Sequence, residues 1–233
     1  AWSLNYRRAF LLHAYDTQSK RTAEAFEQAW SEREGEMAVT VAFDNEQAAS
    51  SEISKALQIP LSEQRAQKLQ AVLGRQLQST PRRRQDIDFV YLPVTAQQAR
   101  SLKPLLAYHF AQDLPVLSSS RVYTGRLDER SDSDLNGVYF TETPWVLDAM
   151  PALSTRIDRH IEAGAPNSKN LYALGMDAYQ LAPRVALMAQ AATAKHSGLT
   201  GILSVNKQGI VLRIPSWAVF RNGAARPLQV ESI

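Results

Sequence analysis

The sequence predicts an α/β fold in which helices flank a mainly parallel sheet. Short apolar runs of strand length alternate along the chain with longer segments whose apolar residues recur at helical spacing. The first pair shows the pattern, because the run Arg8 to Ala14 (RAFLLHA) is followed by Ala23, Phe26 and Trp30. Strands that alternate with helices indicate parallel sheet built from right-handed βαβ crossovers. The 233 residues suffice for one large domain or two compact lobes.

The same periodicity places the remaining elements in order. Strands are expected over residues 37–43, 88–94, 115–118, 137–141 and 171–175. Amphipathic helices are expected around Ala48 to Leu57, around Ala66 to Leu77, over 96–110, after Pro151 and over 177–194. Ser62 is expected to cap the helix that contains Ala66.

The chain is expected to finish in an antiparallel ribbon. Residues 201–205 and 210–215 are predicted as strands, and the segment Asn206-Lys207-Gln208-Gly209 between them is a hairpin signal that ends in glycine. The polar stretch 126–136 is the most loop-like part of the chain, and we expect it to be mobile.

Composition argues against several classes of function. The longest apolar runs are far shorter than the ~20 residues that a membrane-spanning helix needs. The formal net charge is only +3 and the basic residues are scattered, apart from Arg82, Arg83 and Arg84, so nucleic-acid binding is not expected. The absence of cysteine excludes disulfides and cysteine-ligated metals, and it permits a periplasmic location. No signal peptide is recognised at the start, so an export signal is expected upstream.

No catalytic signature is found in the sequence. The glycine-rich nucleotide-binding, nucleophile-elbow and HExxH patterns are absent, and the four histidines are far apart. The pattern Asp132-x-Asp134-x-Asn136-Gly137 resembles the first half of an EF-hand loop, but Thr143 stands where a bidentate Glu is required. We therefore predict an acidic turn there, and we expect no catalytic residue, metal site or cofactor.

Capture of a small ligand is a serious alternative, because open parallel sheets bind ligands beyond the carboxyl ends of their strands. The candidate residues follow three expected strands, and they are Thr95, then Ser119, Ser120 and Arg121, then Asp177 and Tyr179. Backbone amides at helix starts, hydroxyl groups and one guanidinium together suit a small anionic or zwitterionic molecule. The competing interpretation assigns the serines to turns and Asp177 to a helix N-cap.

Short motifs spread in order along the chain give a more specific indication. They are Leu73-Gly74 with Pro81-Arg82-Arg83-Arg84-Gln85-Asp86-Ile87-Asp88, Leu102-Lys103-Pro104, Ser119-Ser120-Arg121-Val122-Tyr123, Leu135-Asn136-Gly137-Val138 with Pro144-Trp145, Leu171-Tyr172-Ala173-Leu174-Gly175-Met176-Asp177-Ala178-Tyr179, Gly198-Leu199-Thr200-Gly201 and Trp217-Ala218-Val219-Phe220. In these motifs the chain resembles, over essentially its whole length, the C-terminal domain of the LpoA family of penicillin-binding protein activators.

The resemblance implies a type I periplasmic-binding-protein-like fold, with two Rossmann-like lobes of parallel sheet and flanking helices joined at a hinge. On that basis, residues 1–94 and a returning C-terminal segment are expected to form the remainder of the first lobe, truncated at its N-terminus. Residues 95–215 are expected to form the second lobe. The family's helical-repeat domain and its lipid-bearing cysteine are expected upstream of this chain.

By the same resemblance, the expected function is to bind a class A penicillin-binding protein, a bifunctional peptidoglycan synthase, and to stimulate its cross-linking activity. The expected location is the periplasm, with the outer membrane reached only through an upstream lipid anchor. The family supplies no catalytic residues. Arg82, Arg83, Arg84 and Tyr123 are candidate partner contacts, because exposed arginine and aromatic side chains are common anchors of interfaces.

Two other functions are kept beside this one. The first is periplasmic capture of an amino acid or a cell-wall fragment between the lobes by the loops around Arg121 and Asp177. The second is an enzyme acting on the cell wall, which requires a histidine or carboxylate cluster that only the fold can assemble.

Overall fold

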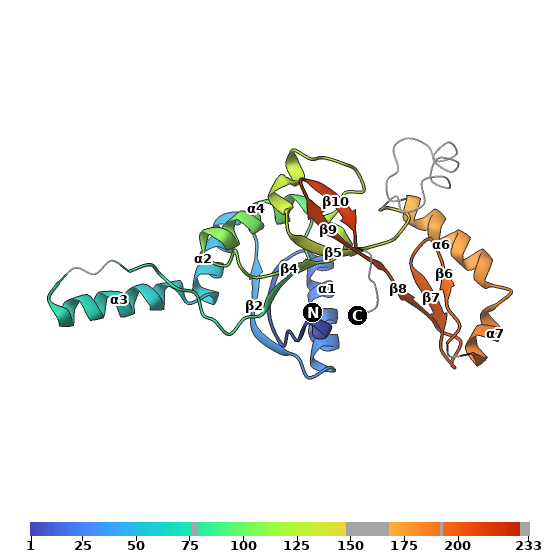
Figure 1. Cartoon of the computed structure of the whole chain (residues 1–233), viewed down its shortest axis with the longest axis horizontal. Coiled ribbons are helices and arrows are strands. Elements are labelled where there is room, and N and C mark those ends of the chain that lie inside the picture. Colours follow the sequence, from blue (N-terminus) through green and yellow to red (C-terminus); the bar gives the residue numbers. More distant parts are fainter. Residues whose placement is uncertain (76–78, 148–167, 192, 229–233) are drawn as a thin grey trace.

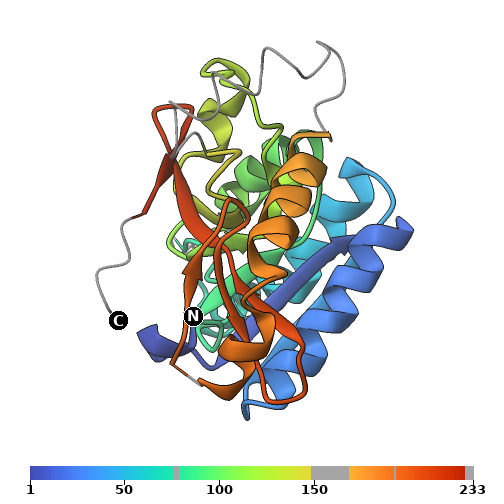
Figure 2. The same ribbon diagram turned by 90° about the vertical axis from the view of Figure 1, so that its right-hand side faces the viewer.

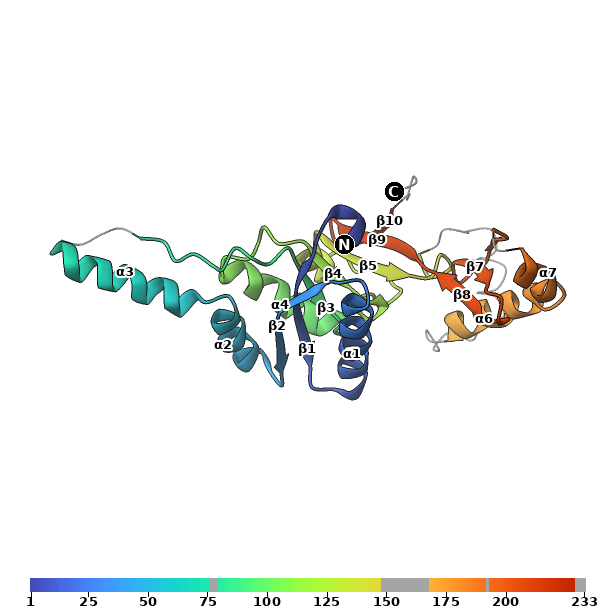
Figure 3. The ribbon, with the colours of Figure 1, turned by 90° about the horizontal axis from the view of Figure 1, so that it is seen from below.

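The computed structural model describes residues 1–75, 79–147, 168–191 and 193–228, and these form two units (Figure 1). The larger unit is built on a seven-stranded sheet, and the smaller unit contains a three-stranded sheet. In Figure 1 and in the view from below in Figure 3, the smaller unit lies at one end of the molecule and helix α3 projects from the other.

The larger unit contains most of the elements that were expected from the sequence. In chain order they are η1 (Trp2–Leu4), β1 (Arg8–Ala14), α1 (Thr17–Ser31), β2 (Glu36–Phe43), α2 (Glu46–Ala56), α3 (Ile59–Leu73), β3 (Phe89–Leu92), α4 (Ala96–Tyr108), β4 (Val116–Ser118), η2 (Ser120–Val122), η3 (Ser131–Leu135), β5 (Val138–Glu142), β9 (Ser216–Arg221) and β10 (Ala224–Pro227). Helix α3 begins earlier than expected, because Pro60 lies in its first turn and Gln58 is its N-cap, so the prediction of Ser62 as the cap was wrong.

The large sheet has the strand order β10-β9-β5-β4-β3-β1-β2. Strands β1 to β5 pair with one another in parallel, whereas β9 runs antiparallel to β5 and β10 antiparallel to β9. The parallel part therefore has the doubly wound order 2-1-3-4-5, in which the direction of winding reverses between β1 and β3. The predicted α/β class with mainly parallel sheet is confirmed.

Alternation along β1 explains why both faces of this sheet are covered. Phe10 and Leu12 join the main core, to which α2 and α4 contribute Ile53 and Leu102. Ala9 lies in a second cluster on the other face, where α1 packs its aromatic side chains. In that cluster the Phe26 ring stacks on Tyr91 with centroids 4.1 Å apart, and the Trp30 ring meets Phe89 edge-on at 5.3 Å.

The boundary expected near residue 94 does not divide the structure. Strand β3 lies before it and β4 after it, and the two pair directly, with Val90 opposite Val116. Parallel pairing of β1, β3 and β4 makes all of them part of one sheet, so the change of unit occurs later, between β5 and α6 (Ser168–Leu181).

The smaller unit contains α6, α7 (Val185–Gln190), β6 (His196–Ser197), β7 (Ile202–Val205) and β8 (Val211–Ile214). Figure 2 looks onto this unit, with α6 beside its sheet and the larger unit behind. The C-terminal hairpin is confirmed, because β7 and β8 pair antiparallel with Ile202 opposite Ile214. Only Pro215 separates β8 from β9 of the large sheet.

The strand predicted over 171–175 was wrong, because these residues belong to helix α6. Their apolar run resembles a buried strand, but Ala173, Asp177 and Leu181 are the buried positions, and they are spaced four residues apart. The helix predicted over 177–194 is divided between α6 and α7. Leu77, the helix expected after Pro151 and His160 lie outside the described residues.

Candidate functional site

The carboxyl edge of the parallel strands is where the sequence placed a ligand site. The loops that follow β1, β3 and β4 meet there, and they carry Asp16, Thr95 and Arg121. Crevices at such a reversal of winding are frequent ligand sites in open α/β sheets. The question is whether these polar groups are free to receive a ligand.

Arg121 is already engaged by the chain itself. Its Nη1 donates to Ser19 Oγ at 2.6 Å, and its Nη2 lies 3.2 Å from Asp16 Oδ1. The same carboxylate caps α1 by accepting from the backbone N–H groups of Gln18 and Ser19. Burial alone would raise the pKa of Asp16, but the hydrogen bonds from Ser19 and the charge of Arg121 outweigh it, and the pKa is lowered. An internal carboxylate thus occupies the place that an anionic ligand would take.

The three candidate hydroxyl groups of this edge differ in how they are engaged. Thr95 forms a capping box at the start of α4 with Gln98, which confirms neither a ligand role nor its absence. Ser120 is exposed and begins η2. Ser119 Oγ differs, because this atom is buried and has no hydrogen-bond partner among the described residues. Ser119 is therefore the group at this edge with unused hydrogen-bonding capacity.

Asp177 and Tyr179 do not join this edge, because both belong to α6 in the smaller unit (Figure 1). The buried Asp177 carboxylate accepts from the backbone N–H groups of Leu199 and Thr200, each at 2.8 Å, and from the Thr200 hydroxyl at 2.6 Å. Asp177 is thus a clamp on the turn 198–201 and not a helix cap. Tyr179 is 84% exposed beside Met176, in an open apolar hollow of about 430 Å³ on the outer face of α6.

The arginine triplet separates into three different environments. Arg83 is only 8% exposed and its guanidinium binds both carboxylate oxygens of Asp113. Arg84 makes a bidentate pair with Asp86, with both N–O distances 2.6 Å. Arg82 is exposed. Of the three, Arg82 alone presents a guanidinium for which no contact is found in the described parts of the chain.

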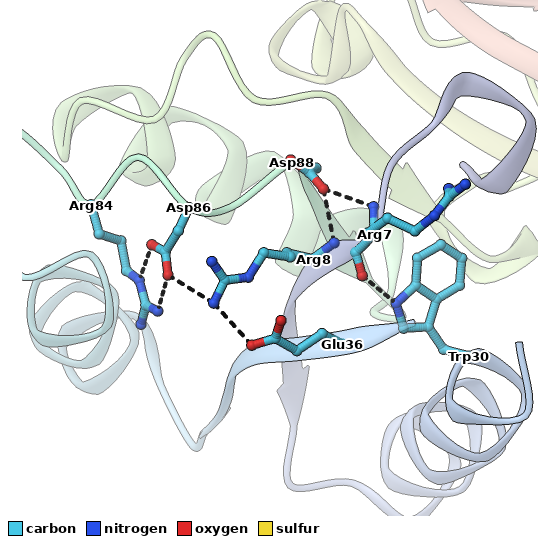
Figure 4. Close-up of polar contacts among 7 residues, drawn as sticks. All are labelled: Arg7, Arg8, Trp30, Glu36, Arg84, Asp86 and Asp88. Carbon is cyan, nitrogen blue, oxygen red and sulfur yellow. Dashed lines mark hydrogen bonds and ion pairs between the residues drawn. The ribbon is translucent and has the colours of Figure 1, made fainter. Parts of the chain in front are cut away.

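Figure 4 shows the network that holds Arg84. Asp86 also pairs with Arg8 at 3.2 Å, and Arg8 reaches Glu36 at 2.9 Å. The hydrogen bonds from Arg84 lower the pKa of Asp86 to about 2, against the opposing effect of burial. Beside this network, Asp88 accepts from the backbone N–H groups of residues 7 and 8, at 2.7 and 2.8 Å. The network joins the starts of β1, β2 and β3, so its role is structural.

Tyr123, the remaining candidate contact, is partly buried against the core. Its ring lies 5.6 Å from Phe140 and 6.0 Å from Phe220, between centroids. Sequence could not distinguish this packing from an exposed anchor, because polar residues such as Arg121 and Thr124 lie on both sides of Tyr123.

The described histidines lie in separate environments. His13 contacts the Ala14 carbonyl at 2.9 Å, His109 contacts Ser50 Oγ at 3.0 Å, and His196 contacts Gln180 at 3.1 Å. Burial lowers the pKa of His109. Within residues 1–75, 79–147, 168–191 and 193–228, no group of three or more acidic or histidine side chains is arranged to hold a metal ion. Nor does any helix in those ranges combine the length and apolarity needed to cross a bilayer.

The sequence also missed an exposed apolar surface on α3. Periodicity predicted an amphipathic helix there and so implied a buried apolar face. In the structure Leu61, Leu69, Val72 and Leu73 are all exposed, and Ile59 is the one buried residue of the helix. No local signal in the sequence separates the two cases, because α4 also carries basic residues, Arg100 and Lys103, beside its buried Leu102.

Comparison with protein families identifies relatives of the whole chain. The family model described as LppC putative lipoprotein matches residues 1–223. The penicillin-binding protein activator LpoA of Vibrio cholerae serotype O1 is 27% identical over 216 residues, which are 91% of this chain and 35% of that protein. LpoA of Aliivibrio fischeri is 25% identical over 217 residues, 92% of this chain and 36% of that protein. The chain thus spans about a third of the length of these relatives.

Solved structures show the same fold. The LpoA (YraM) C-domain from Haemophilus influenzae, described as a regulator of PBP1A, superposes with a TM-score of 0.70 at 19% identity, covering 98% of this chain and 63% of that one. A putative branched-chain amino acid ABC transporter from Chromobacterium violaceum gives a TM-score of 0.61 at 24% identity, covering 94% and 61%. The leucine binding protein LivK from Thermotoga maritima gives 0.56 at 17% identity, covering 97% and 61%.

Proposed function

This chain belongs to the LppC putative lipoprotein family, and from that premise we propose that it binds and activates a class A penicillin-binding protein. The observation that carries the proposal is the match of the family over residues 1–223, with relatives named as activators aligned over about nine-tenths of the chain. The proposed setting is the periplasm, with a lipid anchor to the outer membrane supplied by a part of the protein outside this sequence.

The geometry of the described residues supports a binding role. At the carboxyl edge of the large sheet, Thr95 is used in a capping box and Arg121 is neutralised by Asp16. Exposed apolar side chains gather on α3, on α6 and on the β7–β8 hairpin, and these are surfaces suited to a protein partner. The relatives are named as activators and as a regulator, not as enzymes. In the proposal the cross-linking chemistry therefore belongs to the partner.

The proposal is tested by measuring binding and activity together. The purified chain is titrated onto a class A penicillin-binding protein from the same organism, and affinity is measured by surface plasmon resonance. Peptide cross-linking of lipid-linked precursor is measured in parallel. We expect saturable binding and an increase in cross-linking. Absence of both, with the full-length relative of the same organism active under identical conditions, overturns the proposal.

Capture of an amino acid or a cell-wall fragment is the second candidate, and the buried Ser119 Oγ without a partner favours it. A ligand at 100 times its dissociation constant should add ~2.7 kcal/mol to the free energy of unfolding. Thermal-shift measurements with amino acids and muropeptides detect such a gain. Ser119→Ala is the matched control, since it removes only the unused hydroxyl and should abolish the shift. No shift with any of these compounds would exclude this candidate.

A further inference from the structure

Helix α3 (Ile59–Leu73) packs on the larger unit near its start. Ile59 is its buried residue, and every residue from Gln67 to Arg75 except Gln70 is exposed. The helix has 15 residues and is therefore ~22 Å long, and Figures 1 and 3 show it projecting from the body of the molecule. Helices of this length are marginal in water without packing against another surface. The length and exposure of α3 suggest that a partner covers it.

The exposed apolar residues of α3 form one stripe. Successive residues turn by about 100° around the helix axis, so Leu61, Val72 and Leu69 fall within about 80° of one another, with Leu73 at the edge of the same face. Val72 is 82% exposed and the other three are about half exposed. Gln67 and Glu63 lie on the opposite face, and Gln64 lies outside the stripe, about 60° from Leu61; all three are exposed. The helix thus presents an apolar face and a polar face, and both are open to solvent.

The charges around the stripe have one sign. Arg65 lies within the stripe and Lys68 beside it, while Arg75 and Arg82 lie at the two ends of the segment that follows the helix. None of these four side chains has an ion-pair partner within the part of the chain that the structure describes. Glu63 is the acidic residue of α3, and it lies away from the stripe. The complement of this face is an apolar groove with carboxylates along its rim.

The base of α3 is firmly held, which lowers the entropic cost of docking. The Arg83 and Asp113 pair fixes the returning segment, and the backbone N–H of Arg84 donates to the Leu57 carbonyl at 2.9 Å. Within the second turn of α3, Ser62 Oγ accepts from the backbone N–H of Arg82 at 3.0 Å. The helix is therefore presented from a fixed base and is not tethered by a flexible linker.

Resting on the proposed function, we propose that α3 is the docking helix of this domain. Its apolar stripe inserts into an apolar groove bordered by carboxylates on the penicillin-binding protein, and Arg65 and Lys68 pair with that rim. This is the helix-in-groove mode of recognition, in which residues spaced along one helical face act as anchors. The inference assigns the binding surface to a part of the chain remote from the carboxyl edge of the large sheet.

The test compares two double variants that carry the same change of charge at the same three-residue spacing, one pair within the stripe of α3 and one pair outside it. Leu69→Glu with Val72→Glu introduces two carboxylates into the stripe, and Gln64→Glu with Gln67→Glu introduces two outside it. We expect the stripe variant to bind the penicillin-binding protein at least about tenfold more weakly than the wild type, and the control to bind within about twofold. Circular dichroism and thermal unfolding establish that each variant is folded.

A second pair keeps the test decisive if the glutamates unfold α3. Leu69→Ala with Val72→Ala removes the apolar stripe but raises helix propensity, so weaker binding by this variant cannot arise from loss of the helix. Unchanged binding of both stripe variants, beside a wild type that binds, overturns the docking helix and leaves the proposed function intact. Equal weakening by the control overturns it too, because a general charge effect then explains the loss.

Two further outcomes identify other causes. A wild-type chain that fails to bind the penicillin-binding protein removes the proposed function, and the docking helix with it. Sedimentation velocity examines a second copy of the chain as the occupant of the stripe. If the wild type self-associates and the stripe variant is monomeric, α3 is an interface between copies and the proposal is wrong.

Discussion

Asp177 allows a sharp test of how the smaller unit is held together. Asp177 is 2% exposed, and its carboxylate receives hydrogen bonds from Leu199 and from both donors of Thr200. Asp177→Ala leaves three donors unpaired. A hydrogen bond to a charged group contributes ~1.5–3 kcal/mol, so three independent bonds set an upper limit of roughly 9 kcal/mol. Because the donors are adjacent and water can enter the vacated space, we expect a loss of about 3 kcal/mol.

Native-state hydrogen exchange measures this loss where it occurs. A local loss of about 3 kcal/mol corresponds to roughly a hundredfold faster exchange of the backbone amides of β7, which follows the clamped turn. Asp134→Ala is the matched control, since Asp134 is exposed and should change exchange by less than about threefold. If Asp177→Ala leaves the exchange of β7 within threefold of the wild type, the clamp does not stabilise the smaller unit and the reasoning fails.

Two other substitutions have definite outcomes. Asp86→Asn removes the carboxyl group whose pKa Arg84 lowers from 3.8 to about 2. A pKa difference of this size corresponds to roughly 2.4 kcal/mol. Because 34% of the Asp86 side chain is exposed, solvent screens the pair, and we expect the free energy of unfolding at pH 7 to fall by about 1 kcal/mol. Since the pKa of Asp86 is lower in the folded state than in the unfolded state, this contribution is present above about pH 4 and disappears toward pH 2. Urea-unfolding curves of wild type and variant should therefore converge near pH 2. A difference that stays constant with pH contradicts a stabilising Arg84 and Asp86 pair. Gly223→Ala should cost at least about 2 kcal/mol by thermal unfolding, because φ is 70° and an added Cβ would lie 2.1 Å from the Glu129 carbonyl oxygen. Gly74 has a φ of 63°, and an added Cβ there would meet open space. Gly74→Ala therefore measures the backbone strain without a steric clash, and it should lower the free energy of unfolding less than Gly223→Ala does.

Periodicity was sufficient for the elements whose burial is simple. The run Arg8–Ala14 is β1 to the residue, because its side chains are buried on both faces of a parallel sheet and so form a continuous apolar segment. It failed at 171–175, where a short apolar run on a surface helix has the same composition as a buried strand. The expected boundary near residue 94 failed for another reason: pairing between β3 and β4 is a long-range choice that no local pattern records.

The candidate site shows a similar division. Sequence identified Arg83 and Arg84 as basic residues, but their partners Asp113 and Asp86 are fixed only by the fold, and these partners convert both from surface contacts into structural groups. For Arg121, the partner Asp16 is 105 positions away in the sequence numbering, so its neutralisation could not be foreseen. The helix α3 was predicted, but its exposure was not. Amphipathicity indicates that one face of a helix is covered, and it does not say whether the same chain or a partner covers it.

The single residue between β8 and β9 has a mechanical consequence. Pro215 has a fixed φ and is the single residue of the connection, so the two strands act as one stiff lever that crosses from the small sheet into the large one. Next to Pro215, the carbonyl of Ile214 packs closely on Gly201, where an added Cβ would lie 2.3 Å from the carbonyl oxygen. This contact leaves little room for the two strands to bend at Pro215. A torque applied to the smaller unit is therefore transmitted along β9, and the backbone pairs of Ser216 with Glu142 and Trp217 with Thr141 bear the load first.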